Sequence, residues 1–233
     1  AEFITRFIKV DHSRLSTDSD VTFVGVELPA IDDDFMSVMS RFDNLSGAKF
    51  SGTSITDVGL GELARASALS NLDLYANPYV TDAGLAKLVD LEELSVLILS
   101  DLPITGSGIS NFSHLSALRV YDCENLSNSA IPEICRLPKL AVLDLSDSRV
   151  TDEAMTLVDF TSTVEQLHLG STRITNTSLP VIAERFPNLQ NLTLDKLPGI
   201  TDEGAPYLAR MKKLKQLSIY GSGISEQAAA SLQ

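Results

Sequence analysis

The 233-residue sequence contains no tryptophan, only two cysteines and only three histidines. Two cysteines are too few for a disulfide-stabilised scaffold, and no group of cysteines and histidines has the spacing of a zinc site. No glycine-rich phosphate-binding loop is present. We therefore expect a protein that holds no cofactor and no metal ion.

Long apolar runs and an excess of positive charge are also missing. No stretch approaches the roughly 20 apolar residues that span a bilayer, so no membrane span is expected. Residues 1–6 lack the pattern of a secretion signal, which indicates a soluble protein, either cytoplasmic or exported with its leader already removed. Asp and Glu outnumber Lys and Arg by 31 to 18, giving a net charge of −13. This charge disfavours nucleic-acid binding and attracts basic partners.

A repeated pattern occupies most of the chain. The apolar pattern L-x-x-L-x-L recurs nine times, starting at Val21, Leu45, Leu69, Leu94, Leu115, Leu140, Val164, Leu189 and Leu214. Ten or eleven residues after each start comes a second block, typified by Ile55-Thr56-Asp57. The alternating leucines predict a short strand, and the Thr or Ser of the second block predicts a cap on a following helix. Such units bury their apolar faces only by stacking on one another.

These motifs resemble the leucine-rich-repeat family over residues 21–233, in particular its cysteine-containing, ribonuclease-inhibitor-like class with I-T-D-x-G-L repeats. The resemblance implies an α/β right-handed solenoid, or horseshoe, with parallel strands on the concave face and short helices on the convex face. It also implies binding of macromolecules, usually proteins, without catalytic residues. Residues 1–20 lie outside the repeats and are predicted to form an N-terminal cap. Cys123 and Cys135 fall at repeat positions that predict buried packing groups.

Two irregularities interrupt the pattern. The repeat that starts at Leu94 has 21 residues, and its segment 106–112 has poor helix propensity, which predicts a notch in the convex face. The sequence stops inside its last helix, without a capping segment. Association of two copies through that C-terminal end is therefore an alternative to a monomer.

The residues between the recurring leucine positions of each strand are expected to face solvent on the concave side. Three of the five tyrosines lie there, and aspartates follow three consecutive strands. Lys49 with Asp73, and Arg119 with Asp144, are placed to pair across neighbouring strands. We predict that this face binds another protein, through a basic segment of that protein. The candidate residues are Tyr75, Val96, Ile98, Asp101, Arg119, Tyr121, Asp122, Val142, Asp144, Asp147 and His168.

Other interpretations of the same residues stay open at this point. Asp101, Asp122 and Asp147 also fit a calcium-like site, or simply turns that follow strands. His168 and Asp144, with Ser146 or Ser171, form an imaginable catalytic array, but a nucleophile turn and an oxyanion hole are lacking, so no enzyme is predicted. The function predicted is a protein-binding scaffold. The alternative is a structural or adhesive surface repeat that binds glycan or self-assembles through its C-terminal end.

Overall fold

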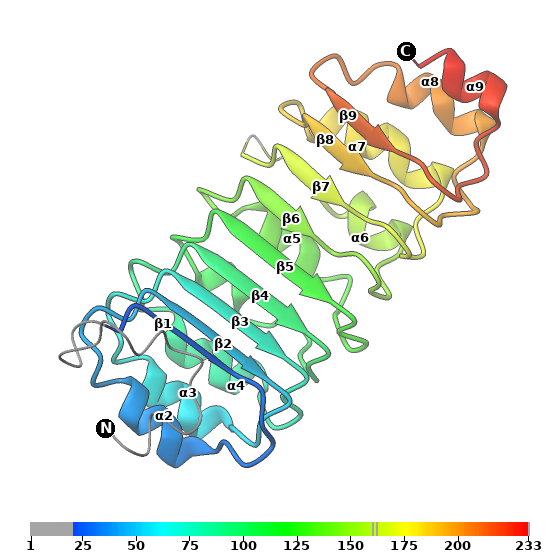
Figure 1. The fold of residues 1–233 in the computed structure, drawn as a ribbon. Coiled ribbons are helices and arrows are strands. Elements are labelled where there is room, and N and C mark those ends of the chain that lie inside the picture. The colour runs from blue at the N-terminus through cyan, green and yellow to red at the C-terminus, as the bar shows by residue number, and fades with distance from the viewer. Residues whose placement is uncertain (1–20, 160, 162, 233) are drawn as a thin grey trace.

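The computed structural model describes residues 21–159, 161 and 163–232. The N-terminal cap predicted for residues 1–20 lies outside these residues. Within the described part, nine parallel strands form one sheet in the order β1-β2-β3-β4-β5-β6-β7-β8-β9. Short helices lie against one face of the sheet and leave the other face open (Figure 1). The predicted α/β repeat architecture is therefore confirmed.

The strands are β1 (Phe23–Val26), β2 (Gly47–Ser51), β3 (Asn71–Tyr75), β4 (Val96–Ser100), β5 (Ala117–Tyr121), β6 (Val142–Asp144), β7 (Gln166–His168), β8 (Asn191–Thr193) and β9 (Gln216–Ser218). The α-helices are α2 (Asp33–Met39), α3 (Asp57–Leu63), α4 (Asp82–Leu85), α5 (Ala130–Cys135), α6 (Asp152–Thr156), α7 (Leu179–Arg185), α8 (Ala205–Leu208) and α9 (Glu226–Ala230). The 3-10 helices are η2 (Ala86–Leu88), η3 (Ile109–Asn111), η4 (Asn176–Ser178) and η5 (Asp202–Gly204).

The leucine pattern sets the strands and their register. Every strand begins two residues after a predicted repeat start. In β3, Leu72 and Leu74 are buried, whereas Asn71 and Tyr75 are exposed, as the two-residue period of a strand requires. Neighbouring strands pair without a register shift, so equivalent positions of successive repeats lie side by side.

A polar contact, which we call the clasp, joins the second blocks of neighbouring repeats. The backbone N–H and the hydroxyl of Thr81 donate to the Asp57 carboxylate at 2.8 and 2.7 Å. The described residues contain seven clasps: Asp33–Thr56, Asp57–Thr81, Asp82–Thr105, Asn128–Thr151, Asp152–Thr175, Asn176–Thr201 and Asp202–Ser225. Hydrogen bonds from Ser225 lower the pKa of Asp202 below its ordinary value.

The chemistry of the clasp also decides whether the threonine caps the next helix. Thr56 and Thr81 donate their hydroxyl protons to aspartate and accept a hydrogen bond from the first helical turn, as predicted. Thr151 instead accepts the amide of Asn128 at 2.8 Å, and its side chain makes no capping bond. Thr201 behaves in the same way: it accepts the amide of Asn176, and its side chain makes no capping bond. The predicted capping therefore holds at Thr56, Thr81, Thr175 and Ser225, whose partners are aspartates, and is wrong at these two asparagine clasps.

The short repeat carries the predicted notch. Between β4 and β5 the helix is reduced to the three residues of η3, and a hollow of about 450 Å³ is lined by Thr105, Ser107, Asn125 and Glu133 among others. Gly106 stands where other repeats have the clasp aspartate or asparagine, and it has a φ of +86°. A Cβ there would lie 2.9 Å from both Ala130 and Leu126, so glycine is required on two grounds.

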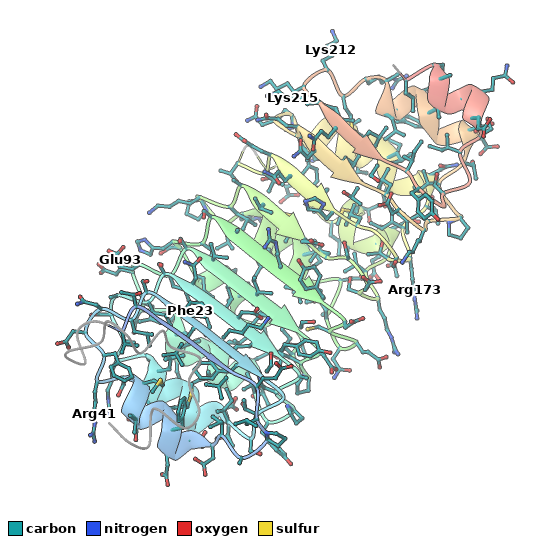
Figure 2. The ribbon with its side chains drawn as sticks, viewed as in Figure 1. Phe23, Arg41, Glu93, Arg173, Lys212 and Lys215 are labelled. Atoms are coloured by element: carbon teal, nitrogen blue, oxygen red, sulfur yellow. The ribbon has the colours of Figure 1, made fainter. Side chains whose placement is uncertain are left out.

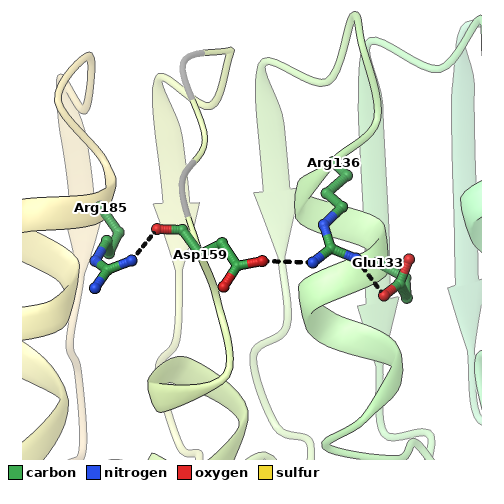
Figure 3. A network of polar contacts seen from close by, with 4 residues as sticks. All are labelled: Glu133, Arg136, Asp159 and Arg185. Atoms are coloured by element: carbon green, nitrogen blue, oxygen red, sulfur yellow. Dashed lines mark hydrogen bonds and ion pairs between the residues drawn. The ribbon is translucent and has the colours of Figure 1, made fainter.

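Exposed charges link the helix side of neighbouring repeats. Arg136 donates to the carboxylates of Glu133 and Asp159, and Arg185 donates to the carbonyl oxygen of Asp159 (Figure 3). Hydrogen bonding to Asp159 and Glu133 raises the pKa of Arg136. Because the groups are solvated, we assign them a minor role in stability.

Both cysteines are free and buried, as predicted. Burial raises the pKa of Cys123 to about 11 and that of Cys135 to about 12. The Cys123 thiol faces the carbonyl oxygen of Leu99 at 3.8 Å. Both thiols thus belong to the core that continues from repeat to repeat.

Neither thiol should react with Ellman's reagent in the folded protein at pH 7.5. The thiolate is the reacting form, and both its low population and its burial oppose attack. We expect no colour before addition of guanidinium chloride and two equivalents of reactive thiol after it. A rapid reaction of either cysteine in the native protein would contradict its assignment to the core.

None of the described helices has the length and apolar character needed to cross a membrane.

Candidate functional site on the open sheet face

The sheet brings the predicted candidates together on its open face. In one row of paired positions, Val96, Ala117 and Val142 are neighbours. In a second row, Ile98, Arg119, Asp144 and His168 follow one another on β4, β5, β6 and β7. In a third row, Ser51, Tyr75, Ser100 and Tyr121 follow one another from β2 to β5. These rows make one continuous surface from strands far apart in the sequence.

The two predicted cross-strand ion pairs have different outcomes. Lys49 Nζ lies 2.9 Å from Asp73 Oδ2, which confirms the first pair. Arg119 and Asp144 face each other across β5 and β6, but they do not form an ion pair among the described residues. The Asp144 carboxylate instead accepts the Ser146 N–H at 3.0 Å. The Arg119–Asp144 prediction was therefore wrong, although the two residues are in register.

The tyrosines supply large amphipathic surfaces. Tyr75 is 46% exposed, and Tyr121 is half-buried. Burial, followed by the charge of Asp144, raises the pKa of Tyr121 to about 12. The Tyr121 hydroxyl therefore stays protonated at neutral pH and keeps its capacity to donate a hydrogen bond.

The aspartates that follow the strands have a backbone reason for their identity. Asp101, Asp122 and Asp147 have φ values of +51°, +48° and +57°. Equivalent positions in other repeats are also left-handed, with Gly52, Ala76, Ser171, Lys196 and Gly221. Aspartate tolerates this conformation better than most residues, which supports the turn-forming interpretation. No three metal-binding side chains in the described part of the chain are placed to hold an ion, so the calcium-like alternative finds no support.

The imagined catalytic array is not formed. The Nδ1 atom of His168 lies 2.8 Å from the Thr193 hydroxyl, on the next strand. Asp144 is aligned with His168 but accepts the N–H of Ser146 rather than orienting the imidazole. These contacts do not align a serine nucleophile with a base and a carboxylate that orients it.

One exposed aromatic residue on the open face was missed from the sequence. Phe23 of β1 is 57% exposed and lies at the first-strand end of the face (Figure 2). It occupies the same repeat position as Val96 and Val142, which were considered only in the central repeats. Gly25 and Gly47 could have drawn attention to it, because a Cβ at either position would press against the Phe23 ring.

Comparison with known proteins gives a fold but no family. No family model matches the sequence, and no curated protein matches it. Among solved structures, one of yeast, "Crystal structure of Rad7 and Elc1 complex in yeast", contains a chain that is 18% identical, with a TM-score of 0.60. The match covers 86% of the present chain and 63% of the Rad7–Elc1 chain, so the present chain spans less than two thirds of that length.

A second structure, "Leiomodin-1 Actin-Binding Site 2 (ABS2)", is 15% identical with a TM-score of 0.45, and the match covers 55% of the present chain and 84% of the leiomodin chain. At this level it adds nothing to the argument. The nine-stranded parallel sheet and the Rad7–Elc1 similarity together identify a leucine-rich-repeat-like fold without assigning the chain to a family.

Proposed function

We propose that the protein is a non-catalytic scaffold that binds another protein through the open sheet face. The observation that carries this proposal is the grouping of Tyr75, Ile98, Arg119 and Tyr121 on the adjacent strands β3, β4 and β5, where the two tyrosines share one row of paired positions and Ile98 and Arg119 share the next. Tyrosine and arginine are the residues most often responsible for binding energy in protein interfaces, and Val96 and Val142 add an apolar strip beside them. The similarity to the Rad7–Elc1 structure supports the fold on which such a surface is built.

The partner is proposed to present a basic segment. Asp101, Asp122 and Asp147 are exposed along one edge of the strands, and the molecule has a net charge of −13. Because like charges in adjacent repeats repel one another, a cationic partner would relieve that repulsion. The backbone explains why aspartate is tolerated at these positions, and the same carboxylates remain available to a ligand.

Affinity capture from a cell extract tests this proposal. The immobilised wild-type chain is compared with Tyr121→Ala and with the matched control Tyr207→Ala, which changes a tyrosine of α8 on the helix side. We expect that the wild type and the control capture the same proteins, and that Tyr121→Ala lowers the captured amount about tenfold or more. Equal capture by all three folded chains would reject the open face as the binding surface.

Self-association is the second candidate function, and β9 favours it. This strand lies at the end of the sheet formed by the described residues, and its Leu217 is only partly buried, like the nearby Met211, Leu214 and Ile219. An edge strand with apolar side chains can pair with a second copy. Light scattering distinguishes the candidates: a concentration-dependent dimer that Leu217→Lys abolishes would favour self-association, and a monomer at all concentrations would oppose it.

A further inference from the structure

An aromatic hollow lies at the β1 end of the open sheet face. It is formed by Phe23, which is 57% exposed, and by Leu28, which is 39% exposed, with Glu27 and Lys49 beside them. Its volume is about 430 Å³. Figure 2 shows Phe23 on the open side of the sheet, away from the helices. We call this region the Phe23 hollow.

Glycines create the space. A Cβ on Gly47 would come within 2.6 Å of the Phe23 ring, and one on Gly25 within 3.3 Å. The ring therefore lies against bare backbone, where a larger residue would force it away. Gly25 and Gly47 thus allow the ring to rest on the backbone of β1 and β2, and Phe23 remains 57% exposed there.

The charges around the hollow do not balance. Lys49 is neutralised by Asp73 at 2.9 Å. Glu27 is exposed and forms no ion pair with any residue of the described ranges. The local field thus favours a positive charge beside whatever apolar group enters the hollow.

We propose that the Phe23 hollow binds an aromatic side chain flanked by lysine or arginine, contributed by a partner protein. The aromatic ring would pack on Phe23 and Leu28, and the flanking cation would approach Glu27. Ser51 pairs in register with Tyr75, so the hollow continues into the surface described above. The proposal rests on the proposed function and adds the chemical identity of one anchor of the partner.

The absence of tryptophan from the protein makes a direct test available. The probe is the peptide Gly-Ser-Lys-Trp-Lys-Ser-Gly with blocked ends, whose indole can be excited without any contribution from the protein. Titration with the full chain should shift its emission to shorter wavelength and reach saturation. Phe23→Ala and Leu28→Ser should each weaken binding, by about tenfold for Phe23→Ala. Tyr220→Ala, which removes another exposed aromatic residue of the open side, should leave the affinity unchanged.

Any of three results with the peptide alone would overturn the inference: undiminished binding by Phe23→Ala, equal binding of a peptide with Glu in place of both Lys, or no change in emission on addition of the wild-type chain. Replacing Phe3 and Phe7 by serine should not change the affinity; an increase would identify the chain's own first residues as the occupant and also overturn it. Tyr121→Ala should not affect this short peptide. If the peptide does not bind but capture still depends on Tyr121, only the Phe23 hollow is rejected. If the peptide binds but capture does not depend on Tyr121, the proposed function is rejected.

Discussion

Replacing Asp152 by alanine is expected to lower the free energy of unfolding by about 2–4 kcal/mol. Its carboxylate accepts the N–H of Thr175 at 2.9 Å and the Thr175 hydroxyl at 2.6 Å, and the Ser178 hydroxyl donates to the same group. Alanine would leave three donors without their acceptor at a partly buried boundary between repeats. Hydrogen bonds to a charged acceptor are stronger than neutral ones, so the loss should exceed that of an ordinary surface mutation.

Urea denaturation followed by circular dichroism measures this effect. Glu203→Ala is the matched control, because Glu203 is an exposed acidic residue at the start of the equivalent helical segment of a later repeat. It should change the free energy of unfolding by less than about 0.5 kcal/mol. Asp152→Asn should lower the free energy of unfolding less than Asp152→Ala does, since Asn128 and Asn176 form clasps elsewhere. If the Asp152→Ala chain is as stable as the control, the clasp does not contribute to the free energy of unfolding.

The strands and the notch could be predicted from the sequence because each depends on local spacing. Leucines two residues apart place their side chains on one face wherever the strand lies. A repeat of 21 residues lacks the chain length for the helix that its neighbours form. The buried positions of Cys123 and Cys135 followed from the same alignment of repeats.

The contacts between repeats could be predicted less well, because they depend on side chains about 24 residues apart. The block Ile55-Thr56-Asp57 predicts only the start of a local helix. In the structure the Asp57 carboxylate also accepts hydrogen bonds from Thr81 of the next repeat. Arg119 and Asp144 are in register but do not form an ion pair, because register fixes the Cα positions and not the directions of the side chains. Phe23 was missed because the position of its ring depends on Gly47 of the next repeat as well as on Gly25 of its own strand.

Replacing Gly84 by alanine is expected to destabilise the protein by about 2–3 kcal/mol, opposite to the usual effect of alanine in a helix. Gly84 lies in α4 and is buried, and a Cβ there would come within 2.3 Å of Asp57 Oδ1 and 3.0 Å of the Asp57 Cα. Either the carboxylate leaves Thr81 or the two repeats separate. The glycine of the I-T-D-x-G-L pattern thus provides the space in which the clasp of the preceding repeat sits.

Gly61→Ala is the control for this last prediction, because Gly61 is also helical but a Cβ there would meet only the flexible side chain of Lys87, at 3.0 Å. It should leave the free energy of unfolding unchanged or raise it by up to about 1 kcal/mol. In a double-mutant cycle, the cost of Gly84→Ala should fall to less than half once Asp57→Ala has removed the carboxylate. Full additivity of the two substitutions would show that Gly84 and the Asp57 carboxylate act independently. Coupling would establish that the aspartate of one repeat and the glycine of the next form a single structural unit.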